Sequence, residues 1–176
     1  FHDIDAGEPD PLSTQAAAAI KNVEVLVLVL RGFSDDFHPA PPGGLDPVKE
    51  FRSMASALVL SDYLVAQKRV ERMTKEAKRD AEWTALNKAI AAFEKEVPLR
   101  DVEIVGEEER AVSGFRFLSR LPLLLVLHVD EAAMGGEAFP ELSKAAAQAG
   151  VPLVRLCAKV EEEIAPSYAN VQYTHA

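Results

Sequence analysis

A cluster of polar residues follows the most apolar stretch of the chain. Leu121–Leu127 is apolar apart from Pro122, and His128, Asp130 and Glu131 come directly after it. A run this short, bounded by polar residues, is typical of a buried strand rather than a buried helix. In open α/β sheets the ligand crevice lies beyond the carboxyl ends of the strands. These three side chains therefore stand where a binding site would be.

Each of these residues also has a purely structural interpretation. A lone histidine at a strand end is more often a structural polar residue than a ligand contact. Glu131 can equally be an acid in the first turn of a helix, where the helix dipole favours it. Cys157 ends a second apolar run, and a cysteine there is usually a small buried hydrophobe rather than a reactive thiol. The residues alone leave these alternatives open.

Apolar runs alternate with helical patterns along the chain. Val23–Leu30 is rich in β-branched residues and predicts a central parallel strand. Val151–Cys157 predicts another strand, after a helix over Phe139–Ala149 that has Pro140 near its start. Alternation of this kind is typical of a parallel sheet with right-handed crossovers. The chain is therefore expected to have an α/β fold.

The middle of the chain has a different pattern, because residues 48 to 97 contain neither Gly nor Pro. Apolar residues recur there at three- and four-residue steps in two stripes: Phe51, Ala55, Val59, Tyr63, Ala66, Val70, Met73 and Ala77, then Trp83, Leu86, Ile90, Phe93 and Val97. Two such stripes predict an antiparallel helical hairpin whose seams pack together as a coiled coil. We expect residues 47–97 to form this hairpin as an insertion into a discontinuous α/β core, residues 1–46 and 98–176.

Composition narrows the class of partner. Asp and Glu outnumber Lys and Arg by 28 to 19, so direct DNA binding by the body of the protein is not expected. No apolar run approaches the roughly 20 residues that span a bilayer, which argues against a membrane partner. Cys157 is the only cysteine, as expected of a cytoplasmic protein. The missing initiator Met indicates a processed product or a piece of a longer chain.

The familiar catalytic and metal motifs are not in this sequence. Neither G-x-x-x-x-G-K-[ST] nor G-x-G-x-x-G occurs, so no phosphate-binding loop lies within the chain. The four histidines are too scattered for zinc spacing. We therefore assign no catalytic residue and no metal ligand from the sequence.

Several short segments follow one another in a recognisable order: Asp46-Pro47, Leu58–Tyr63, Gln67–Arg72, Pro98–Arg100, Glu107–Glu109, Gly114–Leu118, Pro122–Glu131 and Val151–Glu161. This series resembles the YchF, Obg-like family of P-loop NTPases. The first three are similar to the coiled-coil insertion of that family, and the last two to its N-x-x-E and C-A-x-x-E stretches. The resemblance extends over about residues 1 to 165. It implies a G-domain-like, three-layer α/β core of the P-loop NTPase type with the hairpin inserted.

The resemblance also implies a site for a nucleotide base. His128 falls on the Asn and Glu131 on the Glu of the N-x-x-E loop, which reads the base, and this Glu is associated with relaxed specificity and use of ATP. The Cys157-Ala158-Lys159 loop is expected to pass under the base and offer it backbone N–H groups. The ligand implied is ATP or GTP with Mg²⁺, and the implied partner is the ribosome or another protein.

Two departures from the family pattern limit the activity expected. His128 replaces an Asn, and an imidazole cannot donate and accept in the way an amide does. Phe1–Gly7 resembles the family's D-x-x-G switch, but Asp3 and Gly7 are one residue too far apart. The phosphate-binding loop would precede Phe1, and the family's TGS domain is not in this sequence. We expect a nucleotide-binding, translation-associated protein, degenerate or partial, that does not hydrolyse nucleotide by itself. The alternative is a non-catalytic scaffold that docks a partner with its coiled-coil arm.

Overall fold

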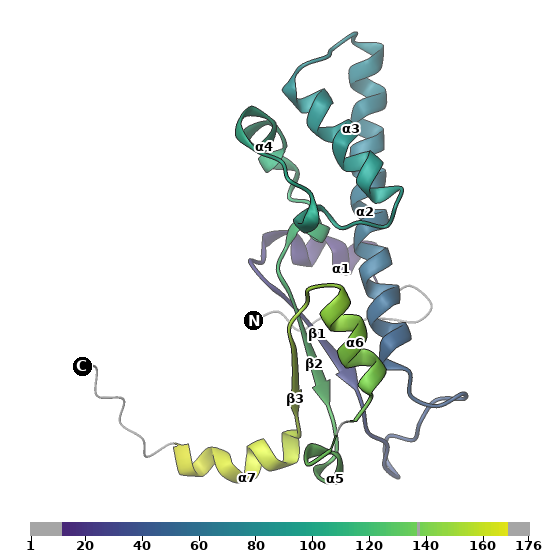
Figure 1. The fold of residues 1–176 in the computed structure, drawn as a ribbon, viewed down its shortest axis with the longest axis vertical. Coiled ribbons are helices and arrows are strands. Elements are labelled where there is room, and N and C mark those ends of the chain that lie inside the picture. Colours follow the sequence, from purple (N-terminus) through teal and green to yellow (C-terminus); the bar gives the residue numbers. More distant parts are fainter. Residues whose placement is uncertain (1–11, 137, 169–176) are drawn as a thin grey trace, which may run out of the picture. The chain divides into compact units, whose positions relative to one another are not determined.

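The computed structural model describes residues 12–136 and 138–168, and Figure 1 shows the course of the chain. Three strands are present in the described part: β1 (Leu26–Arg31), β2 (Leu123–His128) and β3 (Leu153–Leu156). The helices are α1 (Thr14–Ala19), α2 (Pro47–Lys75), α3 (Ala81–Phe93), α4 (Gly106–Val112), α5 (Glu131–Met134), α6 (Pro140–Gln148) and α7 (Ala158–Tyr168). Short 3-10 turns lie at Ile20–Asn22, Leu99–Asp101, Ser113–Phe115 and Leu118–Arg120. The switch-like segment Phe1–Gly7 lies outside the described residues.

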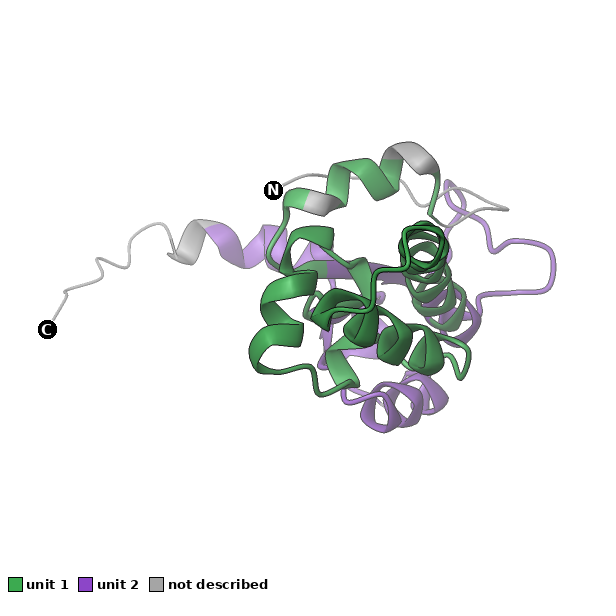
Figure 2. Ribbon diagram, turned by 90° about the horizontal axis from the view of Figure 1, so that it is seen from above, with its two compact units in different colours: residues 1–26, 52–122 green, residues 27–51, 123–176 purple. Residues whose placement is uncertain are grey.

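The chain divides into two compact units, coloured separately in Figure 2. Unit 1 combines Phe1–Leu26 with Arg52–Pro122, and unit 2 combines Val27–Phe51 with Leu123–Ala176. Residues 98–122 thus pack with the hairpin rather than with the strands that follow. The expected insertion of residues 47–97 into a discontinuous core stays a prediction. The division into two compact units follows contacts and does not test whether the hairpin is an insertion.

The sheet has the order β1-β2-β3, so β2 is its central strand (Figure 1). β2 and β3 are parallel, with Leu125 opposite Leu153 and His128 opposite Leu156. β1 runs in the same direction, because its first and last ladder bonds, from the N–H of Leu26 to Pro122 O and from that of Gly32 to His128 O, advance equally along both strands. The α/β class with a parallel sheet is therefore confirmed.

The β-branched residues of β1 predict a central strand, whereas among residues 12–136 and 138–168 its one neighbouring strand is β2. It lies at one edge of the sheet formed by the described residues, and its odd-numbered side chains are open to solvent. Val27 is 52% exposed and Val29 is 63% exposed, whereas Leu30 on the other face is buried. The central position therefore stays a prediction, because β propensity reports a strand's own residues and not the number of neighbours that the strand has.

One face of the sheet in unit 2 is covered by α6, as Figure 1 shows. Leu125 and Leu127 of β2 are fully buried on that face, and Leu142 of α6 is fully buried as well. Pro140 occupies the first turn of the helix, where its missing N–H costs no hydrogen bond. Gly150, at φ 62°, follows the helix and supplies the left-handed conformation that ends it. The predicted helix and both of its end signals are confirmed.

From Val59 to Met73 and from Trp83 to Phe93, the two stripes of the hairpin pack into the core of unit 1, as their spacing predicted. Val59, Ala66 and Met73 of α2 form one apolar cluster with residues of α3 that include Leu86 and Phe93. Asp80 begins α3 by accepting a hydrogen bond from the N–H of Trp83 (3.2 Å). Two stripe residues lie outside the helices: Ala77 is exposed in the turn after α2, at φ 53°, and Val97 comes after the end of α3.

The hairpin does not bury its apolar faces against itself alone. The same cluster continues through Leu99, Ile104, Val112 and Phe117, which follow the hairpin in sequence. Residues 98–122 therefore complete the core of unit 1, which the expectation of two helices zipped only to each other did not include.

A buried carboxylate fixes this returning segment to α2. Asp62 is 2% exposed, and its two carboxylate oxygens accept hydrogen bonds from the backbone N–H groups of Leu118 (2.8 Å) and Ser119 (2.7 Å). Ser119 is fully buried, and its Oγ accepts a hydrogen bond from the N–H of Leu99 (3.1 Å). These bonds satisfy three buried donors that the segment cannot satisfy with its own carbonyls.

Replacing Asp62 tests this connection. We expect Asp62→Ala to lower the free energy of unfolding by about 2–4 kcal/mol, because two buried amides lose a charged acceptor. Urea unfolding followed by circular dichroism measures the change. Asp101→Ala, at an exposed position of the same unit, is the matched control and should stay within about 0.5 kcal/mol. Equal effects of the two substitutions would contradict the role assigned to Asp62.

Candidate functional site

The carboxyl ends of the three strands meet at one edge of the sheet in unit 2. β1 leads into Gly32 and Phe33, β2 leads into α5, and β3 leads into α7. Figure 1 shows α5 and α7 starting at this edge. The N–H of Gly32 donates to His128 O (2.7 Å), and the N–H of Val129 donates to Leu156 O (2.9 Å), so backbone bonds set the spacing of the loops.

His128 is held from two sides. Its Nε2 accepts a hydrogen bond from the backbone N–H of Ala158 (3.1 Å), the first residue of α7. The ring of Phe33 packs against the imidazole with 4.6 Å between centroids and 57° between planes. The histidine predicted as a base contact therefore already joins the loops after β2 and β3.

Glu131 and Lys159 face each other across the same edge. Lys159 Nζ lies 3.6 Å from Glu131 Oε2, and the two side chains are 70% and 66% exposed. Glu131 is the first residue of α5, so its interpretation as an acid in a helix's first turn is confirmed. Asp130 is the N-cap of that helix, and its Oδ1 accepts a hydrogen bond from the N–H of Ala133 (2.8 Å). Solvation keeps the ion pair weak, and both side chains can turn to other partners.

A tight turn after β1 adds a third acid and a second histidine. Asp35 accepts hydrogen bonds from the N–H groups of Phe37 (2.9 Å) and His38 (2.6 Å), and its Oδ1 lies 3.1 Å from His38 Nδ1. The backbone bond from His38 is the main reason that the pKa of Asp35 lies below its usual range. The ring of His38 lies 6.2 Å from that of Phe33, edge to face.

These groups surround one open hollow of about 710 Å³. It is lined by Phe33, Asp35, His38, His128, Val129, Asp130, Glu131, Ala132, Cys157, Ala158 and Lys159. The five residues proposed from sequence for base binding are all in this set. Their role stays a prediction, because a shared hollow does not show what binds there. Cys157 is buried (3% exposed), as its interpretation as a small hydrophobe predicted.

The sequence interpretation missed the contribution of β1 to this hollow. From the sequence, Phe33 ends the apolar run of β1, Asp35 and His38 fall in a Pro- and Gly-rich loop over residues 34–46, and His38 counts only as one of four scattered histidines. The rule that located His128 also applies to them, because they follow the carboxyl end of a strand. What could not be seen was that β1 lies beside β2.

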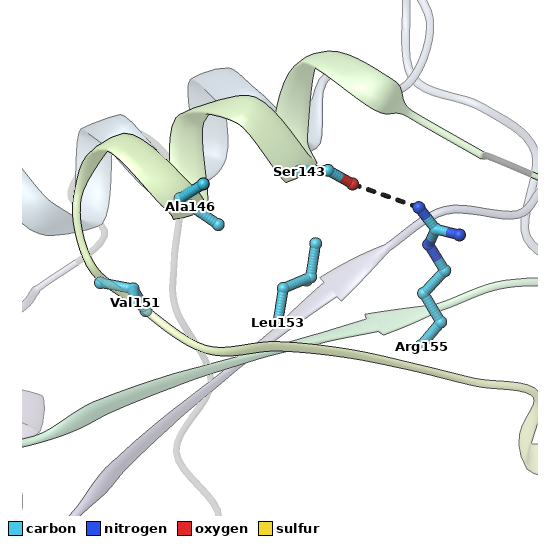
Figure 3. Close-up of a pocket in the computed structure, with 6 residues that line it drawn as sticks. Ser143, Ala146, Val151, Leu153 and Arg155 are labelled. Carbon is cyan, nitrogen blue, oxygen red and sulfur yellow. Dashed lines mark hydrogen bonds between the residues drawn. The ribbon is translucent and has the colours of Figure 1, made fainter.

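A second hollow of unit 2 is lined mainly by apolar side chains. Ser143, Ala146, Ala147, Val151, Leu153 and Arg155 line about 390 Å³ between α6 and β3 (Figure 3). Its one charged group is already bonded within the protein, because Arg155 donates to Ser143 Oγ and to Gly136 O, each at 3.1 Å. We therefore take the hollow at the strand ends as the candidate site.

In residues 12–136 and 138–168, no group of three or more His, Cys, Asp or Glu side chains converges in a way that could hold a metal ion. Within the same ranges, no helix combines the length and apolar character needed to cross a bilayer.

Comparison with known proteins gives sequence relatives and a structural neighbour, whereas no family model matches. The ribosome-binding ATPase YchF of Bacillus subtilis is 32% identical over 169 residues, which are 91% of this chain and 46% of the relative. The protein of the same name from Haemophilus ducreyi is 26% identical over 166 residues, with the same shares. The structure of the Schizosaccharomyces pombe YchF GTPase superimposes with a TM-score of 0.80 over 92% of this chain and 47% of that one, at 18% identity.

The parallel sheet, with a hollow at its carboxyl edge and a helical hairpin between β1 and β2, defines a G-domain-like α/β protein. The sequence relatives and the structural neighbour are more specific than this class, because both carry the name YchF. In sequence and in fold the chain is similar to part of the YchF proteins. It spans about half the length of the curated relatives it matches.

Gly32 offers a test of how the strand ends support the site. A Cβ at this position would lie 3.1 Å from His128 O, 3.0 Å from Leu127 Cδ1 and 3.1 Å from Phe139 Cε2. We expect Gly32→Ala to cost about 1–2 kcal/mol of stability, because a backbone oxygen of the central strand must shift. Because the Ala158 N–H bonds to His128, its resonance in a ¹H–¹⁵N spectrum should also shift when His128 moves.

Gly135 supplies the matched control. It lies in the same unit, has ordinary helical backbone angles, and an added Cβ meets nothing within 4 Å. Gly135→Ala should therefore leave the stability unchanged or raise it by up to about 1 kcal/mol. A neutral Gly32→Ala would show that β1 is not packed tightly against His128.

Proposed function

We propose that this chain is the base-reading part of a nucleotide-binding, translation-associated protein of the YchF family. In this proposal the base of ATP or GTP enters the hollow at the strand ends, where His128, Glu131, Cys157, Ala158 and Lys159 surround it. The relatives are named ribosome-binding ATPases, and the structural neighbour is named a GTPase. A ribosome partner would also give the protein a cytoplasmic location.

The observation that carries the proposal is the convergence of two loops far apart in sequence. Residues 128–131 and 157–159 line one hollow, and the Ala158 N–H bonds to His128. Phe33 adds an aromatic ring, and planar bases stack well on such rings. Glu131 supplies a carboxylate that can accept hydrogen bonds from a base's amino group.

Hydrolysis is not part of the activity we propose for these residues alone. Phosphoryl transfer depends on a Lys-bearing phosphate cradle and on Mg²⁺ held beside it. The sequence of this chain contains no such loop motif. Base recognition and phosphate chemistry are therefore assigned to different segments of the family's longer proteins.

Calorimetric titration of the 176-residue chain with ATP and with GTP tests the proposal. We expect binding without release of inorganic phosphate. Glu131→Ala should weaken binding about five- to tenfold, the effect of losing a hydrogen bond to a charged group. Glu162→Ala, at an exposed position on α7, should bind as the wild type does. Absence of binding at millimolar nucleotide would overturn the proposed function, and measurable turnover would overturn its non-hydrolytic part.

A second candidate function is a docking arm, and the charge of the hairpin favours it. Residues 68–80 carry six of the basic residues and three acidic ones, in a chain whose net charge is −9. Lys68 and Lys75 of α2 are exposed. A basic segment on an acidic protein suits a polyanionic partner such as ribosomal RNA. Docking and base binding are compatible, because they use different units.

Co-sedimentation with ribosomes at two salt concentrations measures the docking function. We expect the double variant Lys68→Glu, Lys75→Glu to lose most of the co-sedimenting protein, because two phosphate contacts become repulsive. Lys49→Glu, Lys95→Glu changes the charge equally at two exposed positions away from residues 68–80 and should retain binding. Equal losses in both variants would indicate an effect of net charge alone and would reject the hairpin as the arm.

A further inference from the structure

We propose that the outer edge of β3, together with the hollow between β3 and α6, binds an extended acidic segment of a partner protein. The segment adds to the sheet as a further strand, antiparallel to β3. Its acidic residue meets Arg155, and an apolar residue enters the hollow. This interaction goes beyond the proposed function and does not involve the nucleotide site.

The backbone of β3 is paired on one side only in the described part of the chain. Among residues 12–136 and 138–168 the sheet ends at β3. The carbonyls of Pro152 and Leu156 accept hydrogen bonds from the strand on the inner side, each at 2.9 Å. Backbone groups alternate in direction along a strand, so Leu153 and Arg155 present theirs to the outer edge. Such an edge can accept an extended segment through backbone hydrogen bonds.

Side chains of the same two residues line the hollow, which has a volume of about 390 Å³. Figure 3 shows Leu153 and Arg155 pointing from β3 toward α6. Ala146 and Val151 are buried beside Leu153, so this end of the hollow is apolar. A strand added to β3 would direct every second side chain to the same face. One apolar side chain of the partner would be removed from water there.

Arg155 supplies the charge complementarity at the other end of the hollow. Its Nη1 donates to Gly136 O and its Nη2 to Ser143 Oγ, each at 3.1 Å, and both acceptors are neutral. No ion pair joins Arg155 to a carboxylate of the described ranges. A guanidinium has more N–H groups than these two bonds use, so a carboxylate can still bind. The two bonds also hold the side chain in place, which lowers the entropic cost of binding.

The direction of the added strand sets the order of residues in the partner. Antiparallel pairing is slightly more stable per residue than parallel pairing, and otherwise parallel sheets often end in an antiparallel edge strand. A segment that runs opposite to β3 passes Arg155 before Leu153. Side chains on one face of a strand alternate with those on the other. The expected segment therefore reads acid, any residue, apolar residue.

A second copy of this chain fits the same edge less well. In an antiparallel pair of β3 strands centred on Val154, each Arg155 would lie opposite Leu153 of the other copy. Neither guanidinium would then meet an acid, and covering a charge without a partner costs free energy. The charge of Arg155 therefore favours an acidic segment of a different protein.

Peptide titrations of the ¹⁵N-labelled 176-residue chain test the proposal. The probe is the capped peptide Ser-Thr-Glu-Thr-Leu-Thr. One comparison peptide has Gln in place of Glu, and another has Glu and Leu exchanged. Dissociation constants are taken from ¹H–¹⁵N shifts, and the dispersion of each spectrum is the check of folding.

Three protein variants accompany the peptides. Arg155→Gln removes the charge. Ala147→Glu places an acid at the rim of the hollow, because Ala147 lines the hollow and is exposed. Gln148→Glu is the matched control, with the same change of charge at an exposed neighbouring position of α6 that does not line the hollow.

We expect the Glu peptide to shift the amide resonances of Leu153 and Arg155. It should bind the wild type about five- to tenfold more tightly than either comparison peptide, the effect of one charge-assisted hydrogen bond. Arg155→Gln should abolish this preference, Ala147→Glu should lose binding of the Glu peptide, and Gln148→Glu should retain it.

Four outcomes would overturn the proposal. They are no binding to the wild type at millimolar peptide, shifts confined to other parts of the chain, an undiminished preference in Arg155→Gln, and equal binding of the peptide with Glu and Leu exchanged. Size-exclusion chromatography adds one more: a dimer that Ala147→Glu dissociates would assign the edge to a second copy instead.

Discussion

The backbone ladder on the two sides of β2 is the constraint on which the candidate site depends. β2 bonds to β1 at one edge and to β3 at the other, so the three strand ends cannot drift apart without breaking ladder bonds. The buried leucines of β2 hold this arrangement from one face. The ladder therefore sets the spacing of the loops that follow the strands. This is why side chains from the loops after β1, β2 and β3 face one hollow although none of those loops is long enough to fold alone.

Much of the fold could be predicted because periodicity and end signals are local. The apolar run at β2, the two stripes of the hairpin and the proline and glycine that bound α6 each need only a few neighbouring residues to be recognised. The position of β1 in the sheet is not local information. Its valines indicate a strand equally well at an edge or in the centre. For the same reason, the sequence indicated a polar cluster at His128 but not its neighbour Phe33, which depends on strand order.

Unit 1 shows the same division between local and long-range information. Asp80 caps α3 from its place just before an apolar stripe, so the signal for this cap lies in a few neighbouring residues. Asp62 has no such signal, because it lies inside a helix and its partners are more than fifty residues away. A carboxylate in the middle of a helical pattern is normally a solvated surface residue. Only the return of residues 98–122 over α2 turns it into the acceptor for two buried amides.

The candidate site combines a rigid part and an adaptable part, and this division bears on what the site can select. His128 is restrained by a backbone hydrogen bond and by the ring of Phe33, so its donors and acceptors point in fixed directions. Glu131 and Lys159 are mostly exposed and are joined by a long ion pair, so they can follow a ligand without losing much. Discrimination between similar ligands needs groups that cannot rearrange, because an adaptable group finds a partner on either ligand. His128 and the Ala158 amide are therefore the part of the hollow suited to discriminate between ligands, while the exposed ion pair can adapt to any of them.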